Sequence, residues 1–243
     1  REAYGTPEFD IVAVNDLTDT KTLAYLLKYD SVYGRYKKSV EAKDGYFDVD
    51  GGKVKVFSEK DPARLPLKEL GIDIVIESTG IFTDAEKVKA HLGAGAKFVV
   101  VTAPCKGDVT TALIGVNDDR FRNAKPITCN ASCTTNCLAT VAKVLEENFG
   151  IVKGFMTTVH SYTDSQNLLD NSHRKDFRLA RSAPNNMIPS STGASKALGL
   201  VLPSLKGKII SSSLRVPLNT VSIIDLTVII KKEADLKEIN NAF

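Results

Sequence analysis

The sequence has no apolar run that approaches the roughly 20 residues needed to cross a lipid bilayer. No signal peptide or transit-like segment opens it, and it has no internal repeat, low-complexity tract or long linker. The formal net charge is only +3, too small to indicate nucleic acid or a membrane surface as a partner. These absences indicate a globular protein and imply neither nucleic acid nor membrane as a partner.

Cysteine and histidine are scarce, with four and three residues. The cysteines, at positions 105, 129, 133 and 137, lie within a short interval and lack the pattern of a disulfide framework. We therefore expect a reducing, cytoplasmic compartment. No Cys-x-x-Cys pair occurs, and Cys133 and Cys137 stand four residues apart on one predicted helix. This spacing argues against zinc, and we expect no bound metal.

The composition is that of a soluble globular protein, with 43% hydrophobic and 25% charged residues. The 243 residues suffice for two domains of ordinary size or one large domain. The chain begins at Arg1 rather than Met, in a segment that is typical of a helix tail with a glycine stop. It ends in a helix-like pattern over 234–243 without a stop signal. Both ends therefore look cut.

Short apolar runs alternate with helical patterns in the first half of the chain. The runs predict strands at 9–14, 72–77, 97–101 and 112–116, helices at 18–30 and 84–92, and a hairpin over 46–58 around Asp50-Gly51-Gly52. Alternating strands and helices predict an α/β fold, here an incomplete doubly wound parallel (Rossmann) sheet.

A second region begins with a predicted strand over 154–160. Its later strands, 212–216 and 221–230, are separated only by a short turn, which indicates an antiparallel sheet. We place the domain boundary near Ser132, giving a dinucleotide-binding domain at 1–131 and an α+β catalytic domain with a largely antiparallel sheet at 132–243. A polar loop over 162–186, without predicted secondary structure, is long enough to indicate a function; it carries Arg174, Lys175, Arg178 and Arg181.

Residues 130–137, Asn-Ala-Ser-Cys-Thr-Thr-Asn-Cys, lie between a strand end at 126–129 and an amphipathic helix. The apolar face of that helix consists of Leu138, Val141, Ala142 and Leu145. Ser132 is a good N-cap, so Cys133 should lie in the first turn, where the helix dipole favours the nucleophilic thiolate. The alternative is that Cys133 is a small buried hydrophobic residue.

This segment resembles the active-site segment of phosphorylating glyceraldehyde-3-phosphate dehydrogenases, and the rest of the chain agrees with that family nearly end to end. The resemblance implies that Cys133 is the nucleophile and His160, in Thr-Thr-Val-His-Ser-Tyr-Thr, its base. Glyceraldehyde 3-phosphate would be oxidised to 1,3-bisphosphoglycerate through a thiohemiacetal and a thioester on Cys133. It also implies a homotetramer, in which the loop over 162–186 packs against a neighbouring subunit's cofactor site. Without the resemblance, a histidine at a strand end is more often structural.

The resemblance further implies two phosphate sites. Thr163 and Arg215 would hold the substrate phosphate, and a second set would hold the attacking inorganic phosphate: Ser132, Thr134, Arg181, Thr192 and Gly193. Two alternatives remain. Thr192 and Gly193 open a predicted helix over 194–202 and could simply cap it. Arg215 could form a structural ion pair, for example with Asp225.

The expected cofactor is NAD, with NADP possible. Asp16 closes a strand where an acidic residue binds the adenosine ribose, although it could equally be a cap or turn residue. Lys60 stands near the adenine where the family commonly has Arg, and three loop residues complete the set: Thr79, Gly80 and Thr102. Asn171-Ser172 replaces the Leu-Pro typical of NAD-specific members.

The glycine-rich turn should precede Asp16 by about 20 residues, so the chain starts too late to contain it. We therefore expect the chain as given to bind NAD weakly and to turn over poorly or not at all. Two other functions stay open: an erythrose-4-phosphate dehydrogenase, and a non-catalytic truncated product.

Overall fold

The computed structural model describes residues 1–174 and 176–243, so Lys175 of the polar loop lies outside the described residues. The chain forms two compact units, one of Arg1–Ile76 with Glu86–Val99 and the other of Glu77–Ala85 with Val100–Phe243. The boundary predicted between residues 131 and 132 falls within the second unit and stays a prediction.

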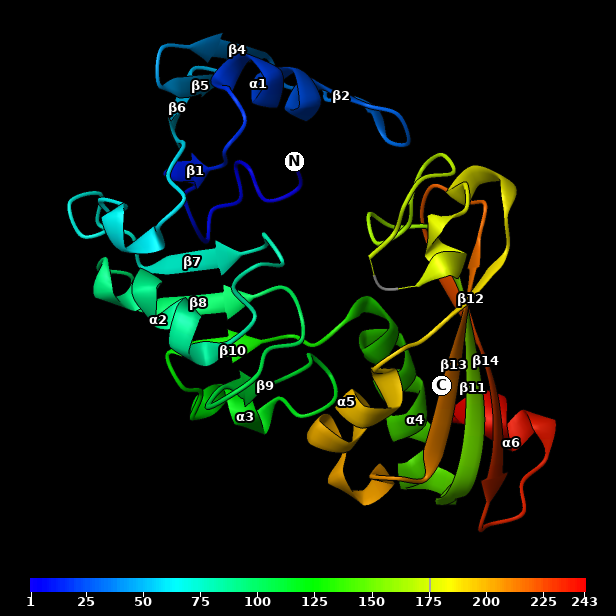
Figure 1. Cartoon of the computed structure of the whole chain (residues 1–243). Helices are drawn as coiled ribbons and strands as arrows, with labels where there is room; N and C mark the ends of the chain where they lie inside the picture. Colours follow the sequence, from blue (N-terminus) through cyan, green and yellow to red (C-terminus); the bar gives the residue numbers. More distant parts are fainter. Residues whose placement is uncertain (175) are drawn as a thin grey trace. The chain divides into compact units, whose positions relative to one another are not determined.

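The first unit contains a four-stranded sheet in the order β1-β6-β5-β4 (Figure 1). The elements in this part of the chain are β1 (Ala13–Asn15), α1 (Thr20–Lys28), β2 (Tyr29–Asp30), β3 (Gly34–Arg35), β4 (Val40–Lys43), β5 (Tyr46–Val49), β6 (Gly52–Phe57) and η1 (Pro62–Arg64). Strand β1 runs parallel to β6, whereas β4, β5 and β6 are antiparallel neighbours. The predicted hairpin is confirmed, because Asp50 and Gly51 both adopt the positive φ of its turn.

A second four-stranded sheet has the order β7-β8-β10-β9. Its strands and the neighbouring helices are β7 (Ile74–Glu77), α2 (Ala85–Gly93), β8 (Phe98–Val101), β9 (Thr110–Thr111), α3 (Asp119–Arg122) and β10 (Ile127–Cys129). Strands β9 and β10 are parallel, as the α/β pattern predicts. The strand predicted over 112–116 is wrong. The Leu113 N–H donates to the Asn117 side chain at 2.8 Å, and Gly115 has a φ of +77°, so this apolar run turns instead of extending.

The third sheet, in the second unit, is mixed and has the order β12-β13-β11-β14. Its strands are β11 (Ile151–Ser161), β12 (Ile188–Ser190), β13 (Ile209–Val216) and β14 (Ser222–Ile230). Strand β11 is parallel to β13 and antiparallel to β14, and β12 is antiparallel to β13. Although β13 and β14 follow one another in the sequence, they do not pair, since β11 lies between them (Figure 1). Their connection meets the end of β11, where the Ser161 N–H donates to the Val221 carbonyl at 3.1 Å.

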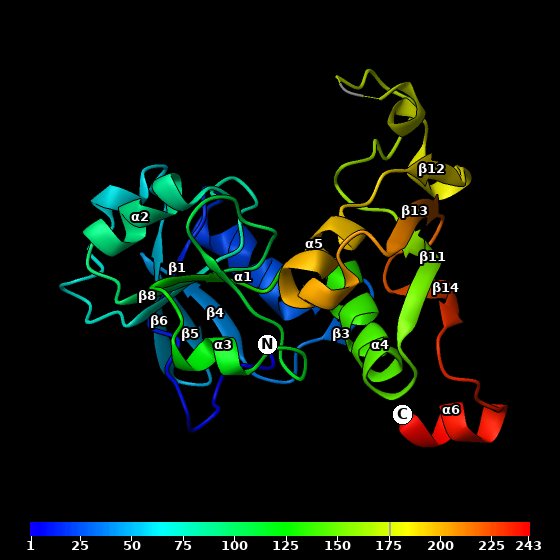
Figure 2. The same ribbon diagram turned by 90° about the horizontal axis from the view of Figure 1, so that it is seen from below.

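Helices α4 (Cys133–Phe149) and α5 (Ala194–Val201) cover one face of this mixed sheet (Figures 1 and 2). Two shorter helices follow in the same unit, η4 (Pro203–Leu205) after α5 and α6 (Leu236–Ala242) after β14. The predicted apolar face of α4 is confirmed, because all four of its side chains pack in one hydrophobic core: Leu138, Val141, Ala142 and Leu145. The same core contains Leu198 of α5 and, from the sheet, Met156 and Ile209. Even α4, with 17 residues, does not meet the length and hydropathy of a membrane-spanning helix, and neither does any other described helix.

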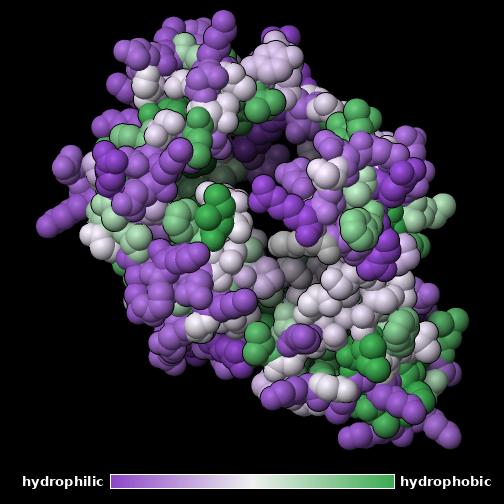
Figure 3. All heavy atoms as spheres, in the orientation of Figure 1, coloured by the Kyte–Doolittle hydropathy of each residue, from purple (hydrophilic) through white to green (hydrophobic). Residues whose placement is uncertain are grey.

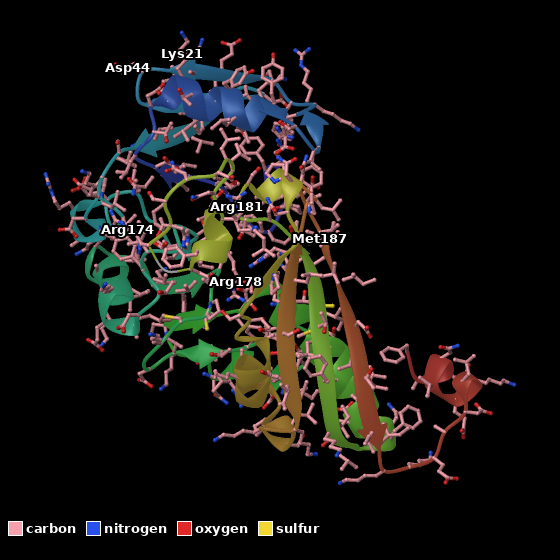
Figure 4. All side chains as sticks on the ribbon, turned by 45° about the vertical axis from the view of Figure 1, so that its right-hand side comes forward. Lys21, Asp44, Arg174, Arg178, Arg181 and Met187 are labelled. Atoms are coloured by element: carbon pink, nitrogen blue, oxygen red, sulfur yellow. The ribbon has the colours of Figure 1, made fainter. Side chains whose placement is uncertain are left out.

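The polar loop between β11 and β12 contains η2 (Phe177–Ala180) and η3 (Ala183–Asn185). The expectation of a loop without secondary structure is therefore wrong. Asn167 organises it: its N–H donates to the Leu179 carbonyl, and its own carbonyl accepts the Ala183 N–H, each at 3.0 Å. Arg178 and Arg181, labelled in Figure 4, belong to this folded loop.

Candidate active site

Cys133 is the first residue of α4, directly after its N-cap Ser132. The Ser132 hydroxyl accepts the Thr135 N–H at 3.2 Å, as expected of an N-cap. The side chain of Asn136 donates to the carbonyls of Asn130 (2.7 Å) and Ser132 (2.9 Å), which fixes the loop that precedes the cysteine. The sulfur therefore lies at the positive end of the helix dipole on a loop held in place by hydrogen bonds.

The four thiols differ in their surroundings. Cys133 is exposed, which excludes the alternative of a small buried hydrophobic residue, whereas Cys129 is 2% exposed in the core. Burial raises the pKa of the Cys105 and Cys137 thiols, so these groups resist ionisation near neutral pH. Cys133 combines exposure with a position at a helix N-terminus.

His160 near the end of β11 faces Cys133. Its Nε2 atom lies 3.4 Å from the Cys133 Sγ, within hydrogen-bond distance for sulfur. Its Nδ1 atom lies 2.8 Å from the Ser161 carbonyl oxygen. In the parallel pairing of β11 with β13, His160 is opposite Arg215, so both side chains lie on the same face of the sheet.

Arg215 completes this cluster. Its Nη1 atom lies 2.6 Å from the His160 Nδ1 and donates to the Ser161 carbonyl at 3.1 Å. Burial lowers the pKa of the guanidinium, and the Cys133 sulfur opposes that shift. The Arg215 Nε is buried and has no hydrogen-bond partner among the described residues.

The alternative ion pair between Arg215 and Asp225 does not form. Asp225 on β14 is opposite Thr157, an odd number of residues from His160, and so lies on the other face of the sheet. No carboxylate of the described residues lies within 4.0 Å of the Arg215 nitrogens. A half-buried guanidinium that lacks an anionic partner can bind an anionic ligand.

The other predicted phosphate ligands have different environments. Thr163 is exposed, and its hydroxyl is 2.9 Å from that of Ser165. Arg181 is exposed and forms an ion pair with Asp170 at 2.9 Å. Thr134 is buried, with 6% of its surface exposed.

Thr192 and Gly193 lie at the start of α5. The Thr192 hydroxyl accepts the Ala194 N–H at 3.2 Å, so the capping role that the sequence left open is present. Gly193 is the N-cap residue and makes no side-chain cap, and the space where a Cβ would lie is open. The first N–H groups of α5 therefore lie beside an uncrowded backbone position.

The predicted cofactor residues fit a dinucleotide in their chemistry. In the first unit, Asp16 follows β1 with an exposed carboxylate, and Lys60 is exposed. In the second unit, Thr79 and Gly80 form an exposed loop after β7, and no atom lies within 4 Å of the place of a Gly80 Cβ. At the end of β7, the Thr102 N–H donates to the Glu77 carbonyl at 2.9 Å. Exposed carboxylate, hydroxyl and backbone groups at strand ends are those that bind ribose and pyrophosphate.

Sequence reasoning missed three contributors to the geometry. Asn136 fixes the loop before Cys133, and the Ser161 carbonyl contacts the His160 ring. The carbonyl of Val221, a residue with a φ of +68°, accepts the Ser161 N–H. No sequence signal marks Ser161 or Val221, because both act through backbone atoms. The short polar side chain of Asn136 just after an N-cap was the one available signal.

An exposed thiol at a helix N-terminus with an imidazole at 3.4 Å is the arrangement of an enzyme that attacks carbonyl carbon through cysteine. Together with parallel strand ends suited to a dinucleotide, this arrangement fits the class of cysteine-dependent dehydrogenases.

Comparisons with known proteins specify the family. The family model described as "Glyceraldehyde 3-phosphate dehydrogenase, NAD binding domain" matches residues 1–85, and the one described as the "C-terminal domain" matches residues 132–243. Proteins named glyceraldehyde-3-phosphate dehydrogenase from Clostridium pasteurianum and Mycobacterium avium are each 51% identical over the whole chain, which covers 73% and 72% of their lengths. The one from Borreliella burgdorferi is 55% identical over 94% of the chain, which is 70% of its own length. The chain belongs to the glyceraldehyde-3-phosphate dehydrogenase family.

Proposed function

We propose that this chain carries the active site for the NAD-dependent oxidation and phosphorylation of glyceraldehyde 3-phosphate to 1,3-bisphosphoglycerate. The 3.4 Å contact between the Cys133 Sγ and the His160 Nε2 carries this proposal, beside a half-buried Arg215 that has no carboxylate partner among the described residues. The exposed thiol gives a carbonyl carbon access to the nucleophile.

In the proposed reaction, the Cys133 thiolate adds to the aldehyde carbon, and the resulting oxyanion takes up a proton to give a thiohemiacetal. His160 accepts the hydroxyl proton at Nε2 as the carbon is oxidised, and a thioester on Cys133 results. NAD, when bound, supplies the hydride acceptor. Inorganic phosphate then attacks the thioester carbonyl, the acyl phosphate leaves, and the Cys133 thiolate is regenerated. The Cys133 backbone N–H is suited to stabilise the oxyanion, because it belongs to the first turn of α4.

Arg215 and Thr163 would hold the phosphate of the substrate. A buried guanidinium forms its strongest contacts with carboxylates or phosphates, and Arg215 has no carboxylate partner among the described residues. The attacking phosphate would use the N-termini of α4 and α5 together with nearby side chains: Ser132, Thr134, Arg181, Thr192 and Gly193. Arg181 would exchange its Asp170 partner for the anion.

For NAD, Asp16 and Lys60 would contact the adenosine half, and Thr79, Gly80 and Thr102 would be further cofactor contacts at strand ends. An acidic residue at the position of Asp16 favours NAD, because it repels the 2′-phosphate of NADP. Asn171-Ser172 in the folded loop leaves NADP use possible.

We also propose that the complete protein is a cytoplasmic homotetramer. The outer face of the mixed sheet exposes four large apolar side chains that a partner subunit could cover: Phe155, Ile210, Ile223 and Ile229. Figure 3 shows hydrophobic residues gathered at the surface over the part of the second unit formed by β14 and α6. Four free cysteines suit a reducing compartment.

The attack of phosphate on the thioester can be run in reverse, and this reverse reaction tests the proposal because it does not require NAD. 1,3-bisphosphoglycerate should acylate Cys133 and release inorganic phosphate, and mass spectrometry should find the 3-phosphoglyceryl group on that residue. Cys133→Ser should abolish the stable modification, whereas Cys137→Ser should not. Absence of acylation, or equal acylation of Cys137, would show that this chain does not perform the proposed chemistry.

A further inference from the structure

The Nδ1 atom of His160 has two neighbours with opposite hydrogen-bonding requirements. The Ser161 carbonyl oxygen at 2.8 Å can only accept a hydrogen bond, whereas the Arg215 Nη1 at 2.6 Å can only donate one. A neutral imidazole nitrogen either carries a proton or offers a lone pair. Nδ1 therefore satisfies one neighbour at a time, and each choice belongs to a different tautomer.

When Arg215 donates to Nδ1, the ring proton lies on Nε2, the atom that faces Cys133 at 3.4 Å. His160 then donates to the sulfur and has no lone pair at Nε2 with which to accept a proton. When Arg215 is elsewhere, the Nδ1–H can donate to the Ser161 carbonyl. Nε2 then has its lone pair directed toward Cys133 and can act as a base.

The Ser161 carbonyl links the two states. It accepts from the Arg215 Nη1 at 3.1 Å, so the guanidinium competes with the ring for this acceptor as well as for Nδ1. Arg215 and Cys133 are the charged or titratable groups that contact the His160 ring, from β13 and α4 respectively. From β14, the residue opposite His160 is the uncharged Ser222. Of these groups, Arg215 is the one that contacts Nδ1, and Cys133 contacts Nε2.

We propose that Arg215 is a substrate-controlled positioning residue, which holds His160 in the Nε2–H tautomer until a phosphate monoester draws the guanidinium away. This proposal rests on the function proposed above, in which Arg215 binds the phosphate of the substrate. On the switch, Nε2 loses a proton to solvent and Nδ1 gains one, so the net charge of the ring does not change. The base is thereby completed only when the correct substrate is bound, which prevents Cys133–His160 chemistry on aldehydes that lack a phosphate.

The surroundings of Arg215 favour such a movement. Its Nε is buried without a hydrogen-bond partner among the described residues, and its Nη1 contacts an imidazole nitrogen and a carbonyl oxygen, so no carboxylate of the described residues holds the guanidinium beside the ring. A phosphate dianion offers charge-assisted, bidentate hydrogen bonds that neither an imidazole nor a carbonyl can match.

Nitrogen-15 NMR of the histidine side chains tests the switch, because the two ring nitrogens have different shifts in each tautomer. The probe is glycerol 3-phosphate, a phosphate monoester without an aldehyde, and His160→Asn assigns the resonances. For the neutral ring, we expect the Nε2–H tautomer without the probe and the Nδ1–H tautomer at saturation. An Nδ1–H tautomer before addition, or an unchanged tautomer at saturating probe, would overturn the proposal.

Two variants separate the switch from general effects of the anion. Arg215→Met keeps most of the side-chain volume without a donor, so it should show the Nδ1–H tautomer at all probe concentrations. Arg178→Met, in the loop and paired with Asp176, should switch as the unmodified chain does. The measurement on the unmodified chain decides the question even if Arg215→Met fails to fold. It also requires no turnover, so a switch without acylation of Cys133 would refute the proposed function alone, and acylation without a switch would refute this proposal alone.

Discussion

The carbonyl oxygen of Val221 accepts the backbone N–H of Ser161 at 3.1 Å, and Val221 makes this contact with a φ of +68°. A β-branched residue in the left-handed region is strained, typically by about 1–3 kcal/mol. The strained residue thus holds the backbone next to His160, whose ring is in contact with the Ser161 carbonyl.

Substitution of Val221 should separate backbone strain from backbone position. Val221→Gly and Val221→Asn can keep the positive φ, so we expect changes in the free energy of unfolding of no more than about 1 kcal/mol and acylation of Cys133 at a similar rate. Val221→Pro cannot reach this φ and should slow acylation strongly. Chemical denaturation and the acylation assay measure both quantities. Equal acylation rates in the glycine and proline variants would mean that the Val221 carbonyl does not position His160.

Cys133 should be the first thiol to be alkylated. With a limiting amount of iodoacetamide near neutral pH, peptide mapping should find the label on Cys133, because it is exposed at a helix N-terminus next to His160. Burial raises the pKa of Cys105 and Cys137, so their labelling should become fast only above the ordinary thiol value of about 8.5. His160→Asn should slow turnover of an active form of the protein by roughly 10²–10⁴. Labelling of Cys137 as rapidly as Cys133 at neutral pH would contradict this assignment.

The two phosphate sites should respond to different substitutions. Arg215→Ala should raise the concentration of 1,3-bisphosphoglycerate needed for half-maximal acylation, since a charge-assisted contact contributes about 1.5–3 kcal/mol. Acylation by acetyl phosphate, which has no second phosphate, should change much less. Thr192→Ala should instead slow discharge of the acyl group by inorganic phosphate. If Arg215→Ala impairs both acyl donors equally, Arg215 has a folding role rather than a substrate-binding role.

Glu146 should contribute stability that is lost in acid. Burial raises the pKa of Glu146, but the Ile151 N–H and the Lys208 ammonium, at 2.5 and 3.1 Å, outweigh it and lower the pKa below its ordinary value. A carboxyl with a lowered folded-state pKa stabilises the fold above its unfolded value, about 4.3, and this contribution disappears as the pH falls through the folded value.

Glu146→Ala should therefore reduce the free energy of unfolding at pH 7 by about 1–3 kcal/mol, and the difference from the unmodified chain should shrink below pH 4. The matched control is Glu147→Ala, because Glu147 is exposed and lies 3.8 Å from Lys143. Its effect should stay below about 0.5 kcal/mol at either pH. Denaturation curves at pH 7 and pH 3 provide the comparison, and a Glu146 effect that is independent of pH would refute the assignment.

The strands and helices that the sequence predicted correctly are those with a local cause. Ser132 begins α4 because its hydroxyl can cap the Thr135 N–H, and the apolar positions of α4 repeat with the period of a helix. The hairpin at Asp50 follows from turn residues that tolerate positive φ. The prediction of a strand over 112–116 failed, because the Asn117 side chain accepts the Leu113 N–H that would otherwise be available to a neighbouring strand.

The sequence by itself determined that Cys133 starts a helix, that strands and helices alternate around it, and which family the chain resembles, since these depend on residue order and periodicity. Only the tertiary structure decided that β11 lies between β13 and β14, and that this register sets His160 beside Arg215. The contacts of the His160 ring, with a cysteine 27 residues before it and an arginine 55 residues after it, arise from packing between distant segments. No local pattern encodes the competition of a carbonyl and a guanidinium for one ring nitrogen, because its members meet only when the sheet and α4 are assembled.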